Sequence, residues 1–384
     1  MLVRVVFAVF FVFALLGDAR IFLFIMNRVV FGSHRHERSP WHFLMYTVPP
    51  VLVLLSTLFW IVPRWIDRPA EAPLLAAIGT AWLIAAAAVG MSWVLDRVRL
   101  YAFPQPSLTG VRDEPAEVIA LRRAHVPFAF IRRLGAHNDV YDIEVTRHQI
   151  FIDGLPETAD GYRIAFLTDT HVASFVRPDF YREILAQVKR FDPHVVLLGG
   201  DFVTWRRHIP LMAEVLVSGL SARDGVFAVL GNHDYWAGAQ EVQNAMEARG
   251  VRFLTNTSVK LPLQVIGIDE MYRGTPDVDK AFADVDPNRP CVGLSHHPDI
   301  IDLVGARRLD LLLCGHTHGG QIRFPFFGAV VVPSAHEGEY AAGFHRVRNV
   351  LMYVSRGIGS IPPLRILCRP EVATFVLRSG RRTL

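Results

Sequence analysis

Five apolar runs dominate the sequence after residue 140, and each of them ends in polar residues. Continuous apolar runs of this length indicate strands that are buried on both faces, and helical patterns lie between several of them. This alternation predicts an α/β fold in which two packed mixed sheets are flanked by helices. The runs cover residues 162–169, 194–201, 225–232, 291–296 and 309–316.

The same patterns place the other elements of this part of the chain. Helices are predicted at residues 178–190, 209–220, 240–249 and 300–308. The chain then returns to sheet structure, with further strands predicted at residues 350–355 and 372–378.

The residues that end the five runs are mostly oxygen and nitrogen donors of the kind that bind divalent cations. In layered α/β folds such groups gather at the carboxyl ends of the strands, so we expect the five clusters to converge. One such cluster arises often by chance, whereas five at successive strand ends predict a metal centre. The clusters are Asp169-Thr170-His171, Gly200-Asp201, Asn232-His233-Asp234, His296-His297 and His316-Thr317-His318.

The order of these motifs, D-x-H, G-D, G-N-H-D, S-H-H-P and G-H-T-H, resembles that of the calcineurin-like metallophosphoesterases. The resemblance extends over about residues 141–384, and GHTHGGQ at 315–321 and SRGIG at 355–359 are similar to the membrane-anchored bacterial branch. It implies a dinuclear-metal hydrolase that cleaves phosphoesters, either a phosphodiesterase or a pyrophosphatase. The implied cofactors are two divalent metal ions, which would be Mn, Zn or Fe.

The resemblance also implies a set of metal ligands. Alternate residues of a strand project to the same side, so the D-x-H spacing suits two ligands of one ion. One ion would be held by Asp169, His171 and His318. The other would be held by Asn232, His296 and His316, with Asp201 as the bridge between both ions.

Two further residues are assigned to catalysis by the same resemblance. A hydroxide that bridges the two ions would attack phosphorus in line, and His233 would protonate the leaving alkoxide. The carboxylate of Asp234 would orient His233. Thr204 stands where purple acid phosphatases carry a metal-binding tyrosine, so a divalent pair is expected rather than a ferric centre.

Two residues are candidates for contacting the substrate, although no specificity pocket is recognisable in the sequence. His297 either contacts the substrate or packs beneath its loop. Phe324, which precedes Phe326 and Phe327, either belongs to an apolar lip that accepts an acyl chain or packs in the core.

The apolar excess of the chain falls in its first hundred residues. Stretches 42–63 and 74–95 each provide about twenty residues without a charge, enough to cross ~30 Å of hydrocarbon. Stretch 5–26 is interrupted by Asp18 and Arg20. It is either a third span whose Asp18/Arg20 pair faces other helices, or a signal-type segment that is cleaved after small residues.

These observations divide the chain into a transmembrane block (1–99), a basic linker (100–140) and a catalytic domain (141–384). Within the linker, residues 114–123 are a candidate short helix, and the basic pairs suit either an anionic lipid surface or solvent. Arginines beside the apolar stretches place the catalytic domain in the cytoplasm by the positive-inside rule. The prediction is a multi-pass protein of the bacterial inner membrane.

The expected partners follow from this location. They are the lipid bilayer and a phosphoester substrate that is lipid-linked or related to the cell envelope. The formal charge of +4 comes mainly from arginines beside the apolar stretches, and no basic stripe interleaved with aromatic residues indicates nucleic acid. The three cysteines form no disulfide framework, and Cys291 and Cys314 are expected to be buried thiols.

A second class of function stays open, namely a membrane metal-binding or sensor protein without turnover. His233 and Asp234 favour the enzyme, because a site that only binds metal has no need of a proton donor.

Overall fold

The computed structural model describes residues 9–10, 12–18, 20–21, 73–102, 108, 110–121, 138–174, 176–329 and 331–380. The chain divides into two compact units. The smaller comprises residues 1–106 and 325–337, and the larger comprises residues 107–324 and 338–384. All five predicted strand ends lie in the larger unit.

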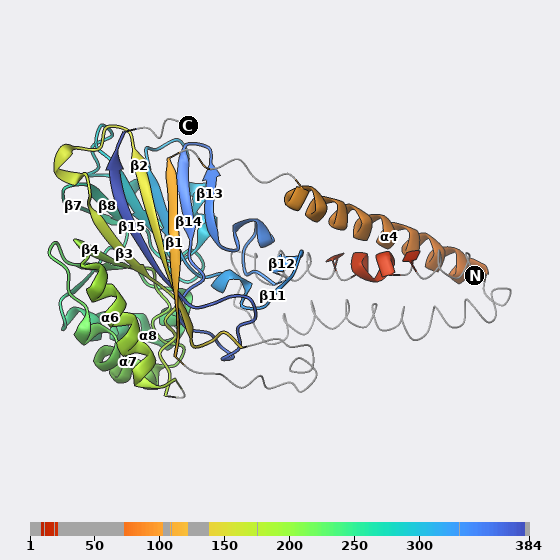
Figure 1. The fold of residues 1–384 in the computed structure, drawn as a ribbon, viewed down its shortest axis with the longest axis horizontal. Helices are drawn as coiled ribbons and strands as arrows, with labels where there is room; N and C mark the ends of the chain where they lie inside the picture. The colour runs from red at the N-terminus through yellow and green to blue at the C-terminus, as the bar shows by residue number, and fades with distance from the viewer. Residues whose placement is uncertain are drawn as a thin grey trace. The chain divides into compact units, whose positions relative to one another are not determined.

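The first sheet of the larger unit has seven strands in the order β1-β2-β15-β3-β4-β5-β6 (Figure 1). Strands β3 to β6 run parallel, whereas β15 is antiparallel to β3 and β1 is antiparallel to β2. The sheet is therefore mixed, as predicted. Its strands are β1 (Val111–Ala120), β2 (Asp142–Ile152), β15 (Glu371–Ser379), β3 (Arg163–Leu167), β4 (Val195–Leu198), β5 (Val226–Ala228) and β6 (Val251–Phe253).

The second sheet has six strands in the order β13-β14-β10-β9-β8-β7. Strands β14, β10, β9 and β8 are parallel, and the two edge strands are antiparallel to their neighbours. Its strands are β13 (Gly343–Val347), β14 (Val350–Val354), β10 (Leu311–Cys314), β9 (Cys291–Leu294), β8 (Gln264–Gly267) and β7 (Thr257–Lys260). The short strand β11 (Arg323–Phe324) also lies in this unit.

Alternating side chains join the two sheets. In β4, Val195 and Leu197 belong to the core between the sheets, whereas Val196 and Leu198 belong to the core under the helices. Strand β10 alternates in the same way. Because both faces of these strands are covered, their sequences are continuously apolar, which is why the five strands could be predicted.

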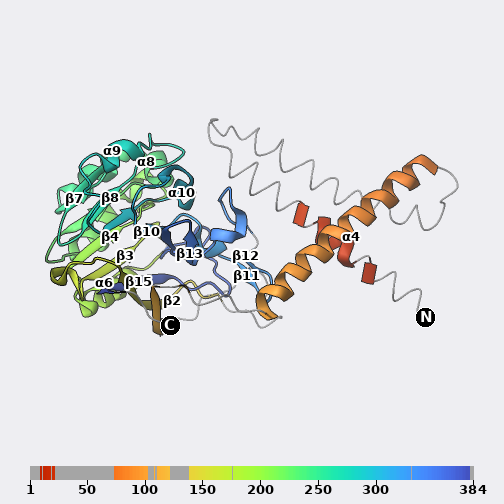
Figure 2. The same cartoon turned by 90° about the horizontal axis from the view of Figure 1, so that it is seen from above.

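Helices cover the outer faces of both sheets, so the larger unit has four layers. Helices α6, α7 and α8 pack on the first sheet (Figure 1), and α9 and α10 pack on the second (Figure 2). The helices are α6 (Pro178–Phe191), α7 (Ile209–Val215), α8 (Asn232–Glu247), α9 (Val278–Phe282) and α10 (Ile301–Val304). The buried thiols expected of Cys291 and Cys314 are confirmed.

Four predicted helices differ from the structure. The helix predicted at 114–123 is wrong, because residues 111–120 form the edge strand β1, whose Glu117 pairs with Arg147 of β2 at 2.9 Å. Pro115 lies where the β1–β2 register shifts, a position in which an edge strand tolerates proline. Helix α8 begins eight residues before the predicted start at residue 240, and α7 and α10 are shorter than predicted.

The smaller unit contains α4 (Pro73–Ala102), against which helical residues 12–18 pack. The two approach closely, since a Cβ on Gly17 would lie 1.7 Å from the carbonyl oxygen of Ala86. The indole of Trp82 donates a 2.9 Å hydrogen bond to Asp18. Asp18 therefore faces another helix, as the spanning interpretation of stretch 5–26 expects.

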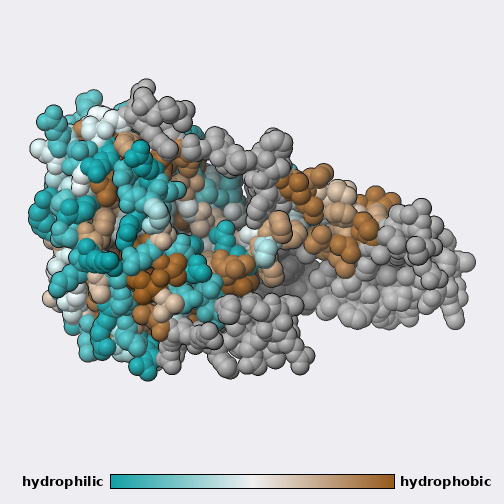
Figure 3. All heavy atoms as spheres, viewed as in Figure 1, coloured by the Kyte–Doolittle hydropathy of each residue, from teal (hydrophilic) through white to brown (hydrophobic). Residues whose placement is uncertain are grey.

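Two other features belong to the smaller unit. From its second segment, which contains β12 (Gly328–Ala329), Phe327 packs against Trp93 of α4 with 4.8 Å between ring centroids. Hydrophobic side chains, among them Ile84 and Leu95, are exposed on α4 (Figure 3).

The predicted membrane spans are not confirmed by the structure. The stretch 42–63 lies outside the described residues, and so does half of 5–26. Within the part of the chain that the structure describes, no helix combines the length and the hydropathy needed to cross a bilayer. The spans therefore stay predictions.

Candidate metal centre

The predicted ligands from the five strand ends come together in the larger unit. Two groups of side chains each have potential ligand atoms within 4.8 Å of one another. The first group is Asp169, His171, Asp201 and His318, and the second is Asp201, His296 and His316. Asp201 belongs to both groups, in agreement with its predicted bridging position.

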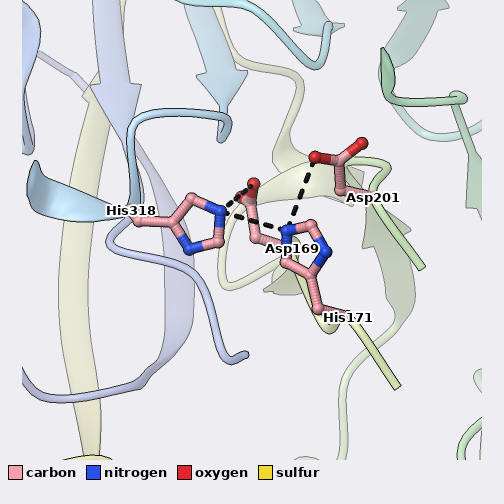
Figure 4. Close-up of side chains that lie close together, drawn as sticks. All are labelled: Asp169, His171, Asp201 and His318. Atoms are coloured by element: carbon pink, nitrogen blue, oxygen red, sulfur yellow. Dashed lines mark hydrogen bonds and ion pairs between the residues drawn. The ribbon is translucent and has the colours of Figure 1, made fainter. Parts of the chain in front are cut away.

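In the first group the side chains point toward one another (Figure 4). Nε2 of His171 lies 3.1 Å from Nε2 of His318. Nε2 of His318 lies 3.4 Å from Oδ1 of Asp169, and Nε2 of His171 lies 3.5 Å from Oδ2 of Asp201. These four side chains come from the ends of β3, β4 and β10.

In the second group Nε2 of His296 is the central atom. It lies 3.4 Å from Oδ2 of Asp201, 3.1 Å from Nδ1 of His316 and 3.2 Å from Oδ1 of Asn232. Oδ2 of Asp201 therefore faces His171 on one side and His296 on the other. All seven predicted ligands are thus brought together by the structure.

The side chains of the two groups bring together more hydrogen-bond acceptor atoms than they have N–H protons to donate. A neutral imidazole carries one N–H, and a carboxylate oxygen carries none. Nε2 of His296 faces three potential acceptors, on Asp201, His316 and Asn232, and a single proton there can bond well to only one of them. Two divalent cations between these groups would satisfy every lone pair, so the donor set fits a dinuclear site.

Hydrogen bonds outside the centre fix the imidazole rings. Nδ1 of His318 faces the carbonyl oxygen of Gly359 at 3.2 Å, and Nδ1 of His296 faces that of Gly199 at 2.8 Å. Nδ1 of His171 lies 2.8 Å from the hydroxyl of Thr204. A carbonyl partner on the second nitrogen selects the tautomer that leaves Nε2 free to bind a metal, and the Thr204 hydroxyl fixes the orientation of the His171 ring.

Five of the seven predicted ligands have a left-handed backbone, with φ between 40° and 69°. Residues with a side chain rarely adopt this conformation, and it costs on the order of 1 kcal/mol or more each. Such strain concentrates at functional sites, where the fold holds side chains in positions that the local chain does not favour. The residues are Asp169, His171, Asp201, His316 and His318.

Burial decides the charge state of most of these histidines. It lowers the pKa of His171 to about 3, and it lowers the pKa values of His316 and His318 well below the usual range. Their rings are therefore neutral near pH 7, which is the form that binds metal. Burial also lowers the pKa of His296, but the charge and hydrogen bond of Asp201, together with the charges of Asp169 and Glu270, outweigh it and raise the pKa to about 10, so a cation at this position displaces a proton.

His233 lies at the edge of the first group without belonging to it. Its backbone N–H donates a 2.8 Å hydrogen bond to Oδ1 of Asp201, and its ring contacts that of His171 edge-on with 4.7 Å between centroids. Its side chain is partly exposed, and within the described residues Nδ1 has no hydrogen-bond partner. The ring is placed next to the centre.

Asp234 differs from its predicted role. Its carboxylate accepts hydrogen bonds from the backbone N–H groups of Gly231 at 2.9 Å, Phe202 at 2.8 Å and Val203 at 3.2 Å. These contacts join the start of α8 to the loop after Asp201. The interpretation that Asp234 orients the imidazole of His233 is therefore corrected, because its oxygens are directed at backbone amides instead.

The two candidates for substrate contact lie in different surroundings. His297 is fully buried, and its ring packs 4.1 Å from that of His316 and 4.5 Å from that of Tyr272. It therefore packs beneath the loop, which was one of its two interpretations. Phe324 is 53% exposed, which excludes a position in the core.

Several residues that support the centre were missed by the sequence analysis. Arg365 is fully buried and donates hydrogen bonds to the carbonyls of Arg356 at 2.9 Å and Gly359 at 2.5 Å, the latter being the acceptor that faces His318. Glu371 accepts hydrogen bonds from Tyr353 and from Arg356. Only the SRGIG segment gave a signal in the sequence, and Arg365 lies beyond it.

Gly357, in the middle of that segment, needs to be glycine for two reasons. Its φ is +67°, and a Cβ on it would lie 2.6 Å from Cβ of Asp169. The segment thus supports the backbone behind this ligand by direct contact.

Comparison with known proteins agrees with this geometry. The family model described as Calcineurin-like phosphoesterase matches residues 162–320. The matched region contains the seven predicted ligands and His233. It ends before Gly357, Arg365 and Glu371.

Three relatives show how far the similarity extends. Phosphodiesterase YaeI of Escherichia coli is 30% identical over 61% of this chain and 88% of its own length. The uncharacterized metallophosphoesterase YkuE of Bacillus subtilis is 28% identical over 62% of this chain and 86% of its own length. A zebrafish protein named "Transmembrane protein with metallophosphoesterase domain" is 28% identical over 63% of this chain and 57% of its own length.

Proposed function

Because the chain belongs to the calcineurin-like metallophosphoesterases and is therefore a hydrolase with two divalent metal ions, we propose that it hydrolyses a phosphodiester. The observation that carries this proposal is the position of Asp201, which faces two groups of ligand atoms at once. When bound, the two ions supply a nucleophile at neutral pH and stabilise charge on the phosphoryl oxygens.

The residues have separate roles in this proposal. Asp169, His171 and His318 would hold one ion, and Asn232, His296 and His316 would hold the other. Asp201, which belongs to both groups of ligand atoms, would contribute to both sites. His233 donates a proton to the leaving alkoxide, because its ring lies beside the ligands without binding as one.

Burial lowers the pKa of His233 below its ordinary value, so the free ring is mostly neutral near pH 7. The assignment of His233 as proton donor therefore rests on its position beside the ligands.

We also propose that the chain is anchored in the bacterial inner membrane, with the catalytic domain in the cytoplasm and a substrate that is lipid-linked or envelope-related. The support is the uncharged apolar sequence of residues 42–63 and 74–95 and the position of the flanking arginines. The name of the zebrafish relative points in the same direction. Retention of the full chain in membranes after washing at alkaline pH is the expected result, and release of the chain contradicts the anchor.

The reaction is tested with bis(4-nitrophenyl) phosphate and the full chain in the presence of Mn²⁺. Turnover is expected, with loss in chelator and in Asp201→Asn. His233→Ala is expected to lower kcat by about 100- to 10,000-fold for a dialkyl phosphodiester, whose leaving alkoxide needs a proton, and much less for bis(4-nitrophenyl) phosphate, whose phenolate leaves without one. If the wild-type protein binds Mn²⁺ but hydrolyses neither diester faster than Asp201→Asn, the second class of function, a metal-binding or sensor protein, replaces the enzyme.

A further inference from the structure

An exposed arginine lies over a tryptophan that packs on the proposed proton donor, and it has no established role. Trp236, one helical turn after His233 in α8, is 53% exposed, and its indole packs 4.6 Å from the His233 ring. The guanidinium of Arg273 lies over this indole, with 5.6 Å from Cζ to the ring centroid. His171, His233, Trp236 and Arg273 thus form a continuous row that leads outward from the metal ligands.

The turn that carries Arg273 is held by two buried carboxylates. Glu270 is fully buried, and its Oε2 accepts hydrogen bonds from the backbone N–H groups of Tyr272 at 2.8 Å and Arg273 at 2.5 Å. Asp269 accepts a hydrogen bond from Thr275 N–H at 2.8 Å. A buried carboxylate loses its hydration, and here hydrogen bonds from the backbone of the turn replace it. The two carboxylates therefore hold this turn in place.

The same turn is tied to helix α8. The hydroxyl of Tyr235 donates a 2.6 Å hydrogen bond to Asp269. Tyr235 precedes Trp236 in the chain, so the helix that carries the indole and the turn that carries Arg273 are fixed to each other. The backbone of the turn and the backbone of α8 therefore hold the guanidinium of Arg273 over the indole of Trp236.

Arg273 keeps its charge available. Its side chain is exposed, and among the described residues no carboxylate lies within ion-pair distance of its guanidinium. Arg206, which is also exposed and near α8, differs in this respect because it pairs with Glu241. A guanidinium that is held by stacking keeps its N–H groups free to form paired hydrogen bonds with a phosphate.

We propose that Arg273 is a specificity-determining residue that binds a phosphate on the leaving group, so that the preferred substrate contains a P–O–P bridge. This inference rests on the proposed function, since His233 marks the side of the leaving group. Hydrolysis of the bridge consumes one water molecule. Water adds to one phosphorus, the bridging P–O bond breaks, and the second phosphate departs as a phosphomonoester that lies against Arg273.

The experiment compares two probes with the full chain and Mn²⁺. ADP-ribose has a P–O–P bridge, so either cleavage expels a phosphomonoester, whereas bis(4-nitrophenyl) phosphate expels a phenolate without phosphate. Arg273→Gln is expected to raise KM for ADP-ribose by about 10- to 100-fold, as loss of a charge-assisted hydrogen bond does. Its kcat/KM for bis(4-nitrophenyl) phosphate is expected to stay within about twofold of wild type.

Three variants serve as controls. Arg206→Gln removes an exposed charge of the same kind and is expected to leave both probes unaffected. Arg273→Lys keeps the charge without the paired hydrogen bonds, and its KM for ADP-ribose is expected to lie between those of wild type and Arg273→Gln. Trp236→Leu removes the stacking surface and is expected to raise KM for ADP-ribose more than KM for bis(4-nitrophenyl) phosphate, because its indole also packs on His233.

The outcomes separate this inference from the proposed function. Equal losses on both probes in Arg273→Gln, or no change on ADP-ribose, overturn the role of Arg273. Wild-type hydrolysis of bis(4-nitrophenyl) phosphate without hydrolysis of ADP-ribose overturns the inference and leaves the phosphodiesterase intact. If the wild-type protein hydrolyses neither probe, the proposed function and the inference are both wrong.

Discussion

At the scale of single residues, the centre depends on side chains that touch ligands rather than the substrate. Thr204 is one of them, because its hydroxyl is the partner of Nδ1 of His171. A hydroxyl here fixes the ring so that Nε2 faces the centre. In the sequence, Thr204 shows only that a metal-binding tyrosine is absent at this position, whereas in the structure it has a positioning role.

Replacing Thr204 by valine removes this hydroxyl and keeps the shape of the side chain. We expect the affinity for Mn²⁺ to fall by about 10- to 100-fold, as is typical when such a partner is lost. The measurement is the Mn²⁺ concentration that restores half of the phosphodiesterase activity after chelation. Thr204→Ser keeps the hydroxyl and should behave like wild type. If serine and valine weaken Mn²⁺ binding equally, the hydrogen bond is not the cause.

Glu371 gives a prediction about acid stability. Burial would raise the pKa of Glu371, but the charge of Arg356 and the hydrogen bonds from Tyr353 and Arg356 lower it more, from 4.5 to about 2. Because the folded-state pKa is the lower one, its contribution is complete above pH 4.5 and is lost as pH falls toward 2. The free energy involved is about 3 kcal/mol.

Urea unfolding between pH 7 and pH 3 checks this, with chelator present so that metal release does not contribute. The free energy of unfolding of wild type should fall more steeply below pH 4.5 than that of Glu371→Gln. If the free energy of unfolding falls equally with pH in the two proteins, the prediction is wrong.

At the scale of elements, the start of α8 organises the site. The helix begins at Asn232, and its first turn carries a predicted ligand, the proposed proton donor and Asp234. The Asp234 carboxylate reaches back to the N–H of Gly231, as acidic residues do in the first turn of helices, and also holds the loop after Asp201. One carboxylate thus connects two ligand-bearing loops.

Asp234→Asn tests this connection. An amide supplies one acceptor oxygen for three N–H groups and directs its own N–H groups at others, so we expect about 1–3 kcal/mol of destabilisation. Activity should fall because the Asp201 loop shifts, and the pH dependence of the remaining activity should keep the wild-type shape. A changed pKa in the kcat profile would show instead that Asp234 acts on His233.

The elements also show what the sequence could reveal. The strands that hold the ligands are apolar on both faces, so a local pattern predicted them together with the polar ends that follow. The start of α8 was missed because its first turn consists of polar residues without a helical period. Strand β1 was mistaken for a helix because its charged side chains pair across the sheet with β2, which no local pattern shows.

Within the site, too, residues in local motifs could be predicted, whereas contacts formed only by folding could not. The seven predicted ligands were found because their motifs follow strands in a fixed order. Arg365 was not found, since it belongs to no motif and acts only through carbonyl groups brought near it by folding. Asp234 was misinterpreted because adjacency in sequence to His233 says nothing about where its carboxylate points.

At the scale of the whole molecule, the metal ions should stabilise the larger unit. They would neutralise the facing lone pairs and hold loops whose backbone is strained. At a free concentration of about 100 times Kd, binding to the folded state alone adds about 2.7 kcal/mol. For a domain of this size that corresponds to a rise in Tm of roughly 5–10 °C.

Thermal unfolding with chelator and with excess Mn²⁺ measures this rise. Asp201→Asn should show a much smaller difference between the two conditions, because it removes the oxygen shared by both groups of ligands. An equal rise in Tm for Asp201→Asn and wild type would mean that Mn²⁺ stabilises the protein elsewhere.

The position of β15 has a consequence for biosynthesis. This strand is the last that the structure describes, yet it lies between β2 and β3 in the middle of the first sheet, and it begins with Glu371, which accepts hydrogen bonds from the Ser355-Arg356 pair. A nascent chain therefore carries every predicted metal ligand out of the ribosome before the sheet that supports them can close. A premature stop codon before residue 371 is expected to disrupt the centre without deleting a single ligand.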